Sequence, residues 1–304
     1  MAPAAFFSSS FNTVCVMDAN SRLGCGLVEQ LLRQGYEVHA AIQSPKESQA
    51  LRKLACDHQN LQIFHSDPFD YQSIVDALKG CSGLFYNFEP PEDYTTYDEF
   101  MGEIEVRAAH NVVEACAQTD TIDKVVFTSS ATAVIWREDR KSSKSDSDET
   151  YWTDINFCRK FKLWHALSKT VAEKAAWALA MDRGVSMVCI NAGLLTGGPD
   201  LTITNPYLKG AAEMYEDGVF VTVDLDFLVE AHVSVFENIA SFGRYLCFNH
   251  VIKTNDDAVK LAQMLTPDSP QPPPSSEKDM RIIQQRISNK KLNSLMEDFR
   301  SGPC

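Results

Sequence analysis

The chain has 304 residues, of which 44% are hydrophobic and 23% charged, and its formal net charge at pH 7 is −13. This length suits one domain with a small appended lobe, and the composition is that of an ordinary soluble globular protein. The negative charge argues against nucleic acid as a partner, because such a surface repels the phosphate backbone.

No run of about 20 apolar residues occurs, so no membrane span and no membrane partner are predicted. The first residues, MAPAAFFSSSFN, have neither the basic start and long apolar stretch of a signal peptide nor the arginines of a transit peptide. The nine cysteines contain no CxxC pair, which favours reduced thiols and a cytoplasmic location. The seven histidines show no HxH or HExxH spacing, so no metal site is predicted.

The first part of the chain alternates between strand and helix patterns. Apolar strands are predicted at NTVCVM (12–17), YEVHAAI (36–42), LQIFHS (61–66), SGLFYNF (82–88), DKVVFTSS (123–130) and VSMVCIN (185–191). Helices are predicted at about 21–34, around QALRKLA (49–55), at about 100–118 and from near Phe157 to Arg183. Gly35 is a typical helix stop. Strands separated by helices indicate an α/β fold with a doubly wound parallel sheet.

After Asn191 the pattern changes. Helices near NPYLKGAAEMYEDG (205–218) and DFLVEAHVSVFEN (226–238) are interrupted by short strands, VFVTVD (219–224) and RYLCFN (244–249). We therefore expect a domain over residues 12–191 and a smaller lobe over 192–304, with a proline-rich connector at 266–276 and an amphipathic last helix around RISNKKLNSLMEDF (286–299). The segment 138–149 is expected to be a solvated loop, and a role in binding a protein partner stays open there.

Several motifs carry a family resemblance. VCVMDANSRLG (14–24), FTSSATAV (127–134), YWTDINFCRKFKLWHALSKTVAEKAAW (151–177), NAGLLTGGP (191–199) and NPYLKGAAEMYEDG (205–218) follow one another along the chain. In this order they resemble the plant cinnamoyl-CoA reductases and dihydroflavonol reductases, which are extended short-chain dehydrogenases/reductases, from about Thr13 to Phe299. The resemblance implies a Rossmann sheet with a smaller C-terminal substrate lobe, NADP or NAD as cofactor, and a small phenolic or related plant metabolite as substrate.

The first turn departs from the family's glycine-rich pattern. Its three glycine positions read Asp18, Ser21 and Gly24, and Arg22 and Leu23 lie in the same expected cofactor-binding turn. A carboxylate about 4 Å from a phosphate repels it by about 4 kcal/mol at an effective dielectric of 20. Alternatively, Asp18 or Ser21 caps the following helix, so that the protein supplies its own anion there.

The next cofactor positions are also changed. Where the NADPH enzymes of the family carry an arginine and often a lysine for the 2′-phosphate, this chain has Gln43 and Ala50, although Lys46 is close by. Asp67 matches the position that contacts the adenine. Phe88 stands where the family has small residues beside the ribose, followed by Glu89. Phe88 either fills part of the groove or is carried away by a loop shift, and both alternatives remain.

The family's catalytic group of serine, tyrosine and lysine is represented by Ser130, His165 and Lys169, with Ser129 as the alternative serine. The i, i+4 spacing places His165 and Lys169 on one helical face. A histidine, with a reference pKa of about 6.5, can act as a general acid. The neighbouring ammonium group disfavours its protonated form, but a neutral imidazole can still donate a hydrogen bond. A structural role for His165 is the alternative.

Two further departures bear on activity. KLWHALSK (162–169) replaces the KNWYCYGK of the thioester-reducing enzymes, so the resemblance does not imply thioester reduction. Asn191 of the expected cofactor site is followed by Ala192, where the family has proline.

Three hypotheses follow. The first is an oxidoreductase with altered chemistry, or an enzyme of non-redox chemistry such as isomerisation or cyclisation in the same pocket. The second is a pseudoenzyme that binds a ligand or a protein. The third and least favoured is an ordinary NADPH-dependent reductase. The hypotheses differ in whether the cofactor site still binds a dinucleotide. Five positions of that site are changed, namely Asp18, Ser21, Gln43, Ala50 and Phe88, which favours a loss of redox function.

Overall fold

A seven-stranded sheet forms the centre of the molecule, with the strand order β3-β2-β1-β4-β5-β6-β9. All neighbouring strands are parallel, which confirms the doubly wound α/β prediction. The strands are β1 (Thr13–Met17), β2 (Glu37–Ile42), β3 (Leu61–His65), β4 (Gly83–Tyr86), β5 (Lys124–Ser130), β6 (Met187–Ala192) and β9 (Gly243–Cys247). The computed structural model describes residues 13–43, 49–88, 90, 97–141, 145–198, 201–267 and 282–301.

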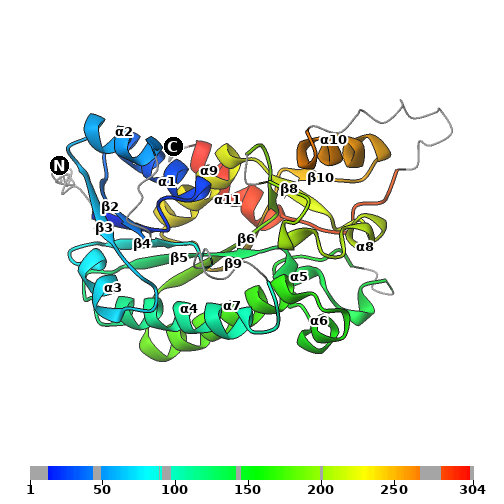
Figure 1. Ribbon diagram of the computed structural model, residues 1–304, viewed down its shortest axis with the longest axis horizontal. Coiled ribbons are helices and arrows are strands. Elements are labelled where there is room, and N and C mark those ends of the chain that lie inside the picture. Colours follow the sequence, from blue (N-terminus) through cyan, green and yellow to red (C-terminus); the bar gives the residue numbers. More distant parts are fainter. Residues whose placement is uncertain are drawn as a thin grey trace, which may run out of the picture.

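Helices cover both faces of this sheet (Figure 1). One face carries α1 (Arg22–Arg33), α2 (Gln49–Asp57), α9 (Leu225–Glu237) and α11 (Lys290–Ser301). The opposite face carries α3 (Tyr71–Leu78), α4 (Met101–Ala117) and α7 (Trp164–Arg183). Because both faces are covered, the strands are apolar along nearly their whole length and their side chains form two separate core clusters.

The strand order places the functional groove. From β1 the chain winds outward through β2 and β3, and it then returns to β4 on the other side of β1. In open α/β sheets, ligands bind outside the carboxyl ends of the strands at such a reversal of strand order. The turn after β1, the end of β4 and the end of β5 therefore border one crevice.

A smaller layer packs against this end of the sheet. It contains a three-stranded sheet in the order β10-β8-β7, built from β7 (Leu194–Leu195), β8 (Val221–Val223) and β10 (His250–Val251). Its helices are α5 (Thr132–Ile135), α6 (Ile155–Phe161), α8 (Ala211–Glu216) and α10 (Asn255–Leu265), with the 3-10 helices η1 (Glu138–Lys141) and η2 (Pro206–Leu208). Together they bury a third apolar cluster.

The segment RYLCFN does not belong to the smaller lobe, where the sequence pattern had placed it. Its first four residues lie in β9, which pairs with β6 and is the seventh strand of the main sheet. Helix α9 provides the crossover that a parallel neighbour requires. The main sheet therefore extends beyond the expected boundary at residue 191.

The predicted helix from Phe157 to Arg183 is two helices, α6 and α7. Lys162 ends α6 in the left-handed region, with a φ of 55°. The amide of Leu163 then donates to the carbonyl of Cys158 at 2.9 Å, which satisfies the helix end. This break lets α7 begin at Trp164, so that His165 lies in the first turn of α7.

Parts of the expected loop at 138–149 are well packed. Residues 138–141 form η1, and Arg140 and Ser147 are buried, so the prediction of a wholly solvated loop was wrong. Most of the proline-rich connector lies outside the described residues. The eight described cysteines are all free thiols. Among the described helices, none combines the length and apolar character needed to cross a membrane.

Candidate active site

The turn after β1 is held together by its own side chains. Asp18 has a φ of 56°, a left-handed conformation that aspartate tolerates better than most residues. The Gln43 side-chain amide donates to the Asp18 carboxylate at 2.6 Å. Ser21 is the N-cap of α1, and its hydroxyl accepts from the amide of Gly24 at 3.0 Å. Of the two capping alternatives, Ser21 is thus the cap, while Asp18 pairs with Gln43.

Gly24 and Arg22 shape the same turn. A Cβ at position 24 would lie 2.2 Å from the carbonyl oxygen of Asp18, so only glycine allows this close approach of helix and turn. Arg22 donates to the carbonyl of Thr196 at 2.5 Å and joins the turn to the loop that follows β7. Both Arg22 and Leu23 line the groove, and Arg22 brings a positive charge to it.

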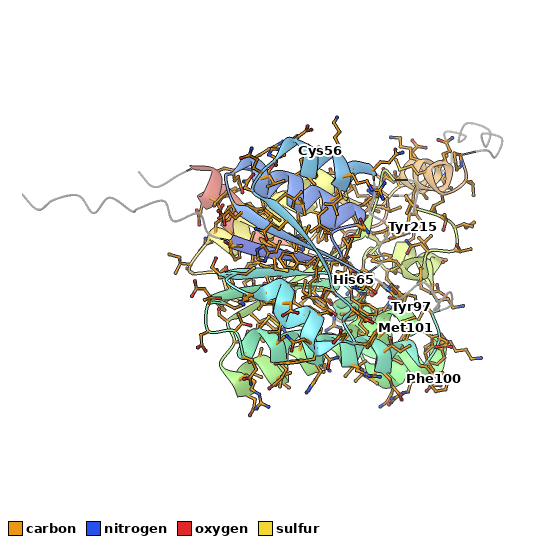
Figure 2. The ribbon with its side chains drawn as sticks, turned by 60° about the vertical axis from the view of Figure 1, so that its left-hand side comes forward. Cys56, His65, Tyr97, Phe100, Met101 and Tyr215 are labelled. Atoms are coloured by element: carbon orange, nitrogen blue, oxygen red, sulfur yellow. The ribbon has the colours of Figure 1, made fainter. Side chains whose placement is uncertain are left out.

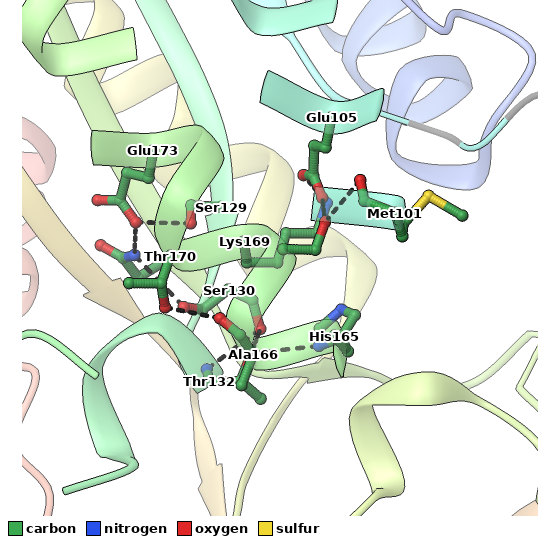
Figure 3. A network of polar contacts seen from close by, with 12 residues as sticks. Met101, Glu105, Ser129, Ser130, Thr132, His165, Ala166, Lys169, Thr170 and Glu173 are labelled. Carbon is green, nitrogen blue, oxygen red and sulfur yellow. Dashed lines mark hydrogen bonds and ion pairs between the residues drawn. The ribbon is translucent and has the colours of Figure 1, made fainter. Parts of the chain in front are cut away.

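At the other end of the groove, Ser130, Thr132 and His165 form a hydrogen-bonded row (Figure 3). The Thr132 hydroxyl lies 3.0 Å from the Ser130 hydroxyl and 3.1 Å from Nδ1 of His165. If Thr132 donates to Nδ1, then Nε2 of the neutral imidazole carries the hydrogen and is a donor. If Thr132 donates to Ser130 instead, Nδ1 carries the hydrogen and Nε2 is an acceptor.

His165 is enclosed by two aromatic rings. The ring centroids of Tyr97 and Tyr207 lie 5.3 and 5.9 Å from that of the imidazole. Figure 2 shows Tyr97 near Met101, the first residue of α4. Desolvation, followed by the charge of Lys169, lowers the pKa of His165 to about 3. At pH 7 the imidazole is therefore neutral and has no ready proton to give.

Lys169 lies one turn further along α7 and is engaged by a carboxylate. Its ammonium group donates to Glu105 of α4 at 2.7 Å. Lys169 is 9% exposed and Glu105 is 1% exposed. The ring centroid of Phe88 lies 5.5 Å from the Lys169 ammonium, and the Phe88 ring is buried in the wall of the groove. Of the two alternatives for Phe88, the structure favours the one in which it fills part of the groove.

Ser129 and Asn191 belong to a different set of contacts. The Ser129 hydroxyl donates to Glu173 at 2.6 Å, and the Asn191 amide donates to the same carboxylate oxygen at 2.8 Å. Arg244 donates to the other oxygen at 2.6 Å. This buried network ties β5, β6 and β9 to α7. It commits the Ser129 hydroxyl to a structural contact, and Asn191 is not among the residues that line the groove.

Asp67 and Ala50 are not among the residues that line the groove. Asp67 accepts from the amide of Phe69 at 2.8 Å and so orders the turn between β3 and α3. Ala50 is exposed near the start of α2. Lys46 and Glu89 are outside the described residues.

Two adjoining cavities meet at His165. The first has a volume of about 300 Å³ and is lined by Arg22, Phe88, Ser130 and Lys169, among others. The second, of about 830 Å³, contains Trp164 and the 202–206 segment in its wall. Both are lined by Tyr97, His165, Asn205 and Pro206. A ligand in either cavity can therefore reach the imidazole.

Sequence reasoning missed Glu105, Thr132, Tyr97 and Tyr207. Glu105 did carry a signal, because Glu105, Ala108, Ala109 and Val112 follow the i, i+3, i+4, i+7 spacing of a buried helix face. A glutamate on such a face needs a cationic or hydrogen-bonding partner.

Comparisons with known proteins agree with this geometry. A family profile described as NAD(P)H-binding matches residues 19–199. Cinnamoyl-CoA reductase 1 of Petunia hybrida is 34% identical over 302 residues, which cover 96% of this chain and 89% of that protein. Dihydroflavonol 4-reductase of Zea mays is 33% identical over 310 residues, which cover 96% and 85%. The chain belongs to the NAD(P)H-binding family of the cinnamoyl-CoA and dihydroflavonol reductases.

Solved structures support the fold of this family member. Vestitone reductase from alfalfa (Medicago sativa) superimposes with a TM-score of 0.72 at 24% identity and covers 94% of this chain and 92% of its own. The yeast methylglyoxal/isovaleraldehyde reductase Gre2, solved with NADPH, gives a TM-score of 0.75 at 17% identity and covers 94% and 93%.

Membership of the family supports NADP or NAD as the cofactor. The residues present fit such a dinucleotide in part. Gly24 permits the close helix approach, and Arg22 and Lys169, the predicted catalytic lysine, line the groove and supply two cations. Asp18 places a carboxylate in the turn where the sequence predicts the pyrophosphate, and Phe88 occupies part of the groove wall. The groove therefore retains the means to hold a dinucleotide, with weaker charge complementarity.

Proposed function

We propose that this chain is an NAD(P)H-dependent oxidoreductase with altered chemistry. It acts on a carbonyl or alcohol of a phenolic or related plant metabolite, and neutral His165 contacts the substrate oxygen in place of the family's tyrosine. The observation that carries this proposal is the row of Ser130, Thr132 and His165 at the junction of two cavities, with Lys169 one turn away.

The substrate class is supported by the relatives and by the cavity walls. The relatives named above reduce cinnamoyl-CoA and dihydroflavonols according to their names. The larger cavity is lined by Tyr97 and Trp164, and Tyr207 lines the smaller one. Aromatic walls of this kind favour an aromatic substrate, because rings gain from stacked and edge-to-face contacts.

The bound dinucleotide supplies or accepts the hydride. The hydrogen of the Thr132 hydroxyl sets the imidazole tautomer. When Thr132 donates to Ser130, Nδ1 of His165 carries the hydrogen and Nε2 accepts from a substrate hydroxyl; when Thr132 donates to Nδ1, Nε2 donates to a substrate carbonyl oxygen. Because the pKa of His165 is about 3, full protonation of the imidazole at pH 7 costs about 5 kcal/mol. Proton delivery is therefore slow, and we expect turnover well below that of a tyrosine-containing family member.

A calorimetric titration with NADPH, NADP, NADH and NAD tests this function, followed by a panel of cinnamaldehydes and dihydroflavonols. We expect micromolar affinity for one dinucleotide and slow consumption of reduced cofactor. His165→Ala should reduce turnover more than it reduces cofactor affinity, because the side chain contacts the substrate. Absence of dinucleotide binding up to millimolar concentration would refute the proposal.

A second candidate is a binding protein without hydride transfer. It is favoured by the internal pairing of both ends of the groove, Asp18 with Gln43 and Lys169 with Glu105. The same titration separates the candidates, because a pseudoenzyme of this kind binds a phenolic ligand without a dinucleotide and consumes no cofactor.

A further inference from the structure

The ammonium group of Lys169 is already held by the protein. Its Nζ donates to Oε1 of Glu105 at 2.7 Å, and both side chains are almost fully buried. An ammonium group has three hydrogens to donate and no acceptor. Each hydrogen bond within the protein therefore leaves one hydrogen fewer for a ligand. The carboxylate also cancels the charge that the lysine presents to the groove.

Glu105 is itself fixed in place. Its second oxygen accepts from the Ser168 hydroxyl, so that both carboxylate oxygens bond to consecutive residues of α7 (Figure 3). The helices α4 and α7 are in close contact at this point. A Cβ at Gly102 would lie 3.3 Å from Val171 and 3.8 Å from the Cα of Ser168. The carboxylate is therefore held between two closely packed helices by hydrogen bonds at both of its oxygens.

Other charges near the groove also reduce the positive charge that it presents to a ligand. Burial raises the pKa of Tyr86, and the negative charges of Glu105 and Asp18 raise it further. The fields of both carboxylates thus reach the end of β4. Arg22 contributes one cation to the groove. The carboxylates of Asp18 and Glu105 lie behind the groove wall and offset the charges of Arg22 and Lys169, which line it, so the groove attracts a dinucleotide more weakly.

We propose that Glu105 is a positioning residue that holds Lys169 in this ion pair and so lowers the affinity of the groove for the nicotinamide-ribose half of a dinucleotide. The inference rests on the proposed function in one respect, because it assumes that a dinucleotide is the ligand. Replacing both partners of a buried ion pair by apolar residues is often neutral for stability, although removing one partner alone is costly. The pair as a whole is thus free to have a role in binding.

The test is Glu105→Gln, which keeps the shape and removes the charge. The dissociation constants of NADP and of adenosine 2′,5′-bisphosphate are measured by calorimetry for wild type and variant. The second probe lacks the nicotinamide ribose. We expect NADP to bind about tenfold more tightly to the variant, the effect of freeing one charged hydrogen-bond donor, while the bisphosphate binds equally to both proteins. A purely structural role would change both affinities together.

Glu105→Asp is the matched control, because it keeps the charge but shortens the reach, and we expect a smaller gain for NADP. Circular dichroism establishes that both variants are folded, and the aspartate variant keeps the test valid if the glutamine variant does not fold. Unchanged or weaker NADP affinity, equal gains for both probes, or no binding to any of the proteins would overturn the inference. The proposed function fails on a different measurement, namely when proteins that bind NADP do not reduce any carbonyl substrate.

Discussion

Helix α7 carries two polar sites that differ in their surroundings. Both carboxylate oxygens of Glu173 accept hydrogen bonds from side chains of the central sheet, and the residue is fully buried. His165 and Lys169, on the turns before it, face a cavity of about 300 Å³. The first site connects three strands of the sheet to α7 through hydrogen bonds and an ion pair. At the second site, charge and shape can change without disconnecting the sheet, and there the sequence predicted a departure from the family's pattern.

The largest expected effect concerns the first site. Glu173→Ala should lower the free energy of unfolding by about 3–5 kcal/mol, because it leaves the Arg244 guanidinium buried without its carboxylate. Denaturant unfolding measures the change. Ser129→Ala is the matched control and should cost only about 1 kcal/mol, the value of one hydrogen bond. Equal losses for the two variants would mean that the ion pair is not the main contribution of this network.

The second prediction concerns Asp18, in the turn after β1. Asp18→Gly should strengthen dinucleotide binding by up to about 4 kcal/mol, because it removes a carboxylate from the expected pyrophosphate position. It also suits the φ of 56° at this residue. Asp18→Asn is the control, since it retains a partner for Gln43 and tolerates the same backbone. Calorimetry with NADP and NAD gives the affinities. If neither variant binds more tightly than wild type, the charge of Asp18 is not the obstacle.

A buried histidine away from the groove predicts the response to acid. His232 is fully buried, with Nε2 2.8 Å from the Thr128 hydroxyl and Nδ1 2.8 Å from the carbonyl of Leu228. Burial lowers the pKa of His232 to about 4. In the unfolded chain this histidine binds a proton below about pH 6.5, whereas in the folded protein it stays neutral until about pH 4. The stabilisation that neutral His232 allows is therefore complete above pH 6.5 and decreases as the pH falls toward 4.

At pH 4 this loss should reach about 3 kcal/mol from His232. Unfolding curves at several pH values measure it, and His232→Gln, which does not titrate, should flatten the dependence over the same window. His165 has a pKa lowered to about 3 and adds to the loss in the same direction. If His232→Gln left the pH dependence between pH 7 and pH 4 unchanged, the buried neutral His232 would not be its source.

The sequence predicted what depends on local pattern. Alternating apolar strands and helices indicated the parallel sheet, and the predicted helix at 21–34 agrees with α1 to within one residue at each end. The i, i+4 spacing brought His165 and Lys169 to one side of α7. These features follow from helix and strand periods, which neighbouring residues alone determine.

Contacts between distant positions could not be predicted in this way. Lys169 and Glu105 are 64 positions apart, and Arg244 and Glu173 are 71 apart, so only the packed fold reveals their pairing. The break between α6 and α7 was also missed. It occurs at Lys162 in a left-handed conformation, where neither glycine nor proline marks a helix end. β9 was assigned to the smaller lobe because the pattern changes after Asn191, and its pairing with β6, far from it in the sequence, is visible only in the fold.

The smallest expected effect tests the groove-facing side of α7 directly. His165→Tyr restores the family's proton donor, and we expect carbonyl reduction to rise about tenfold when a dinucleotide binds. The gain stays below the usual factor of about 10²–10⁴ for a general acid, because Glu105 cancels the Lys169 charge that would lower the tyrosine pKa. His165→Phe is the control, since it adds the ring without the hydroxyl and should give no gain. Turnover is measured with the same panel of cinnamaldehydes and dihydroflavonols. If the tyrosine variant binds the cofactor but reduces no substrate faster than wild type, then the histidine is not what limits this chain, and the charge balance around Lys169 is the remaining cause.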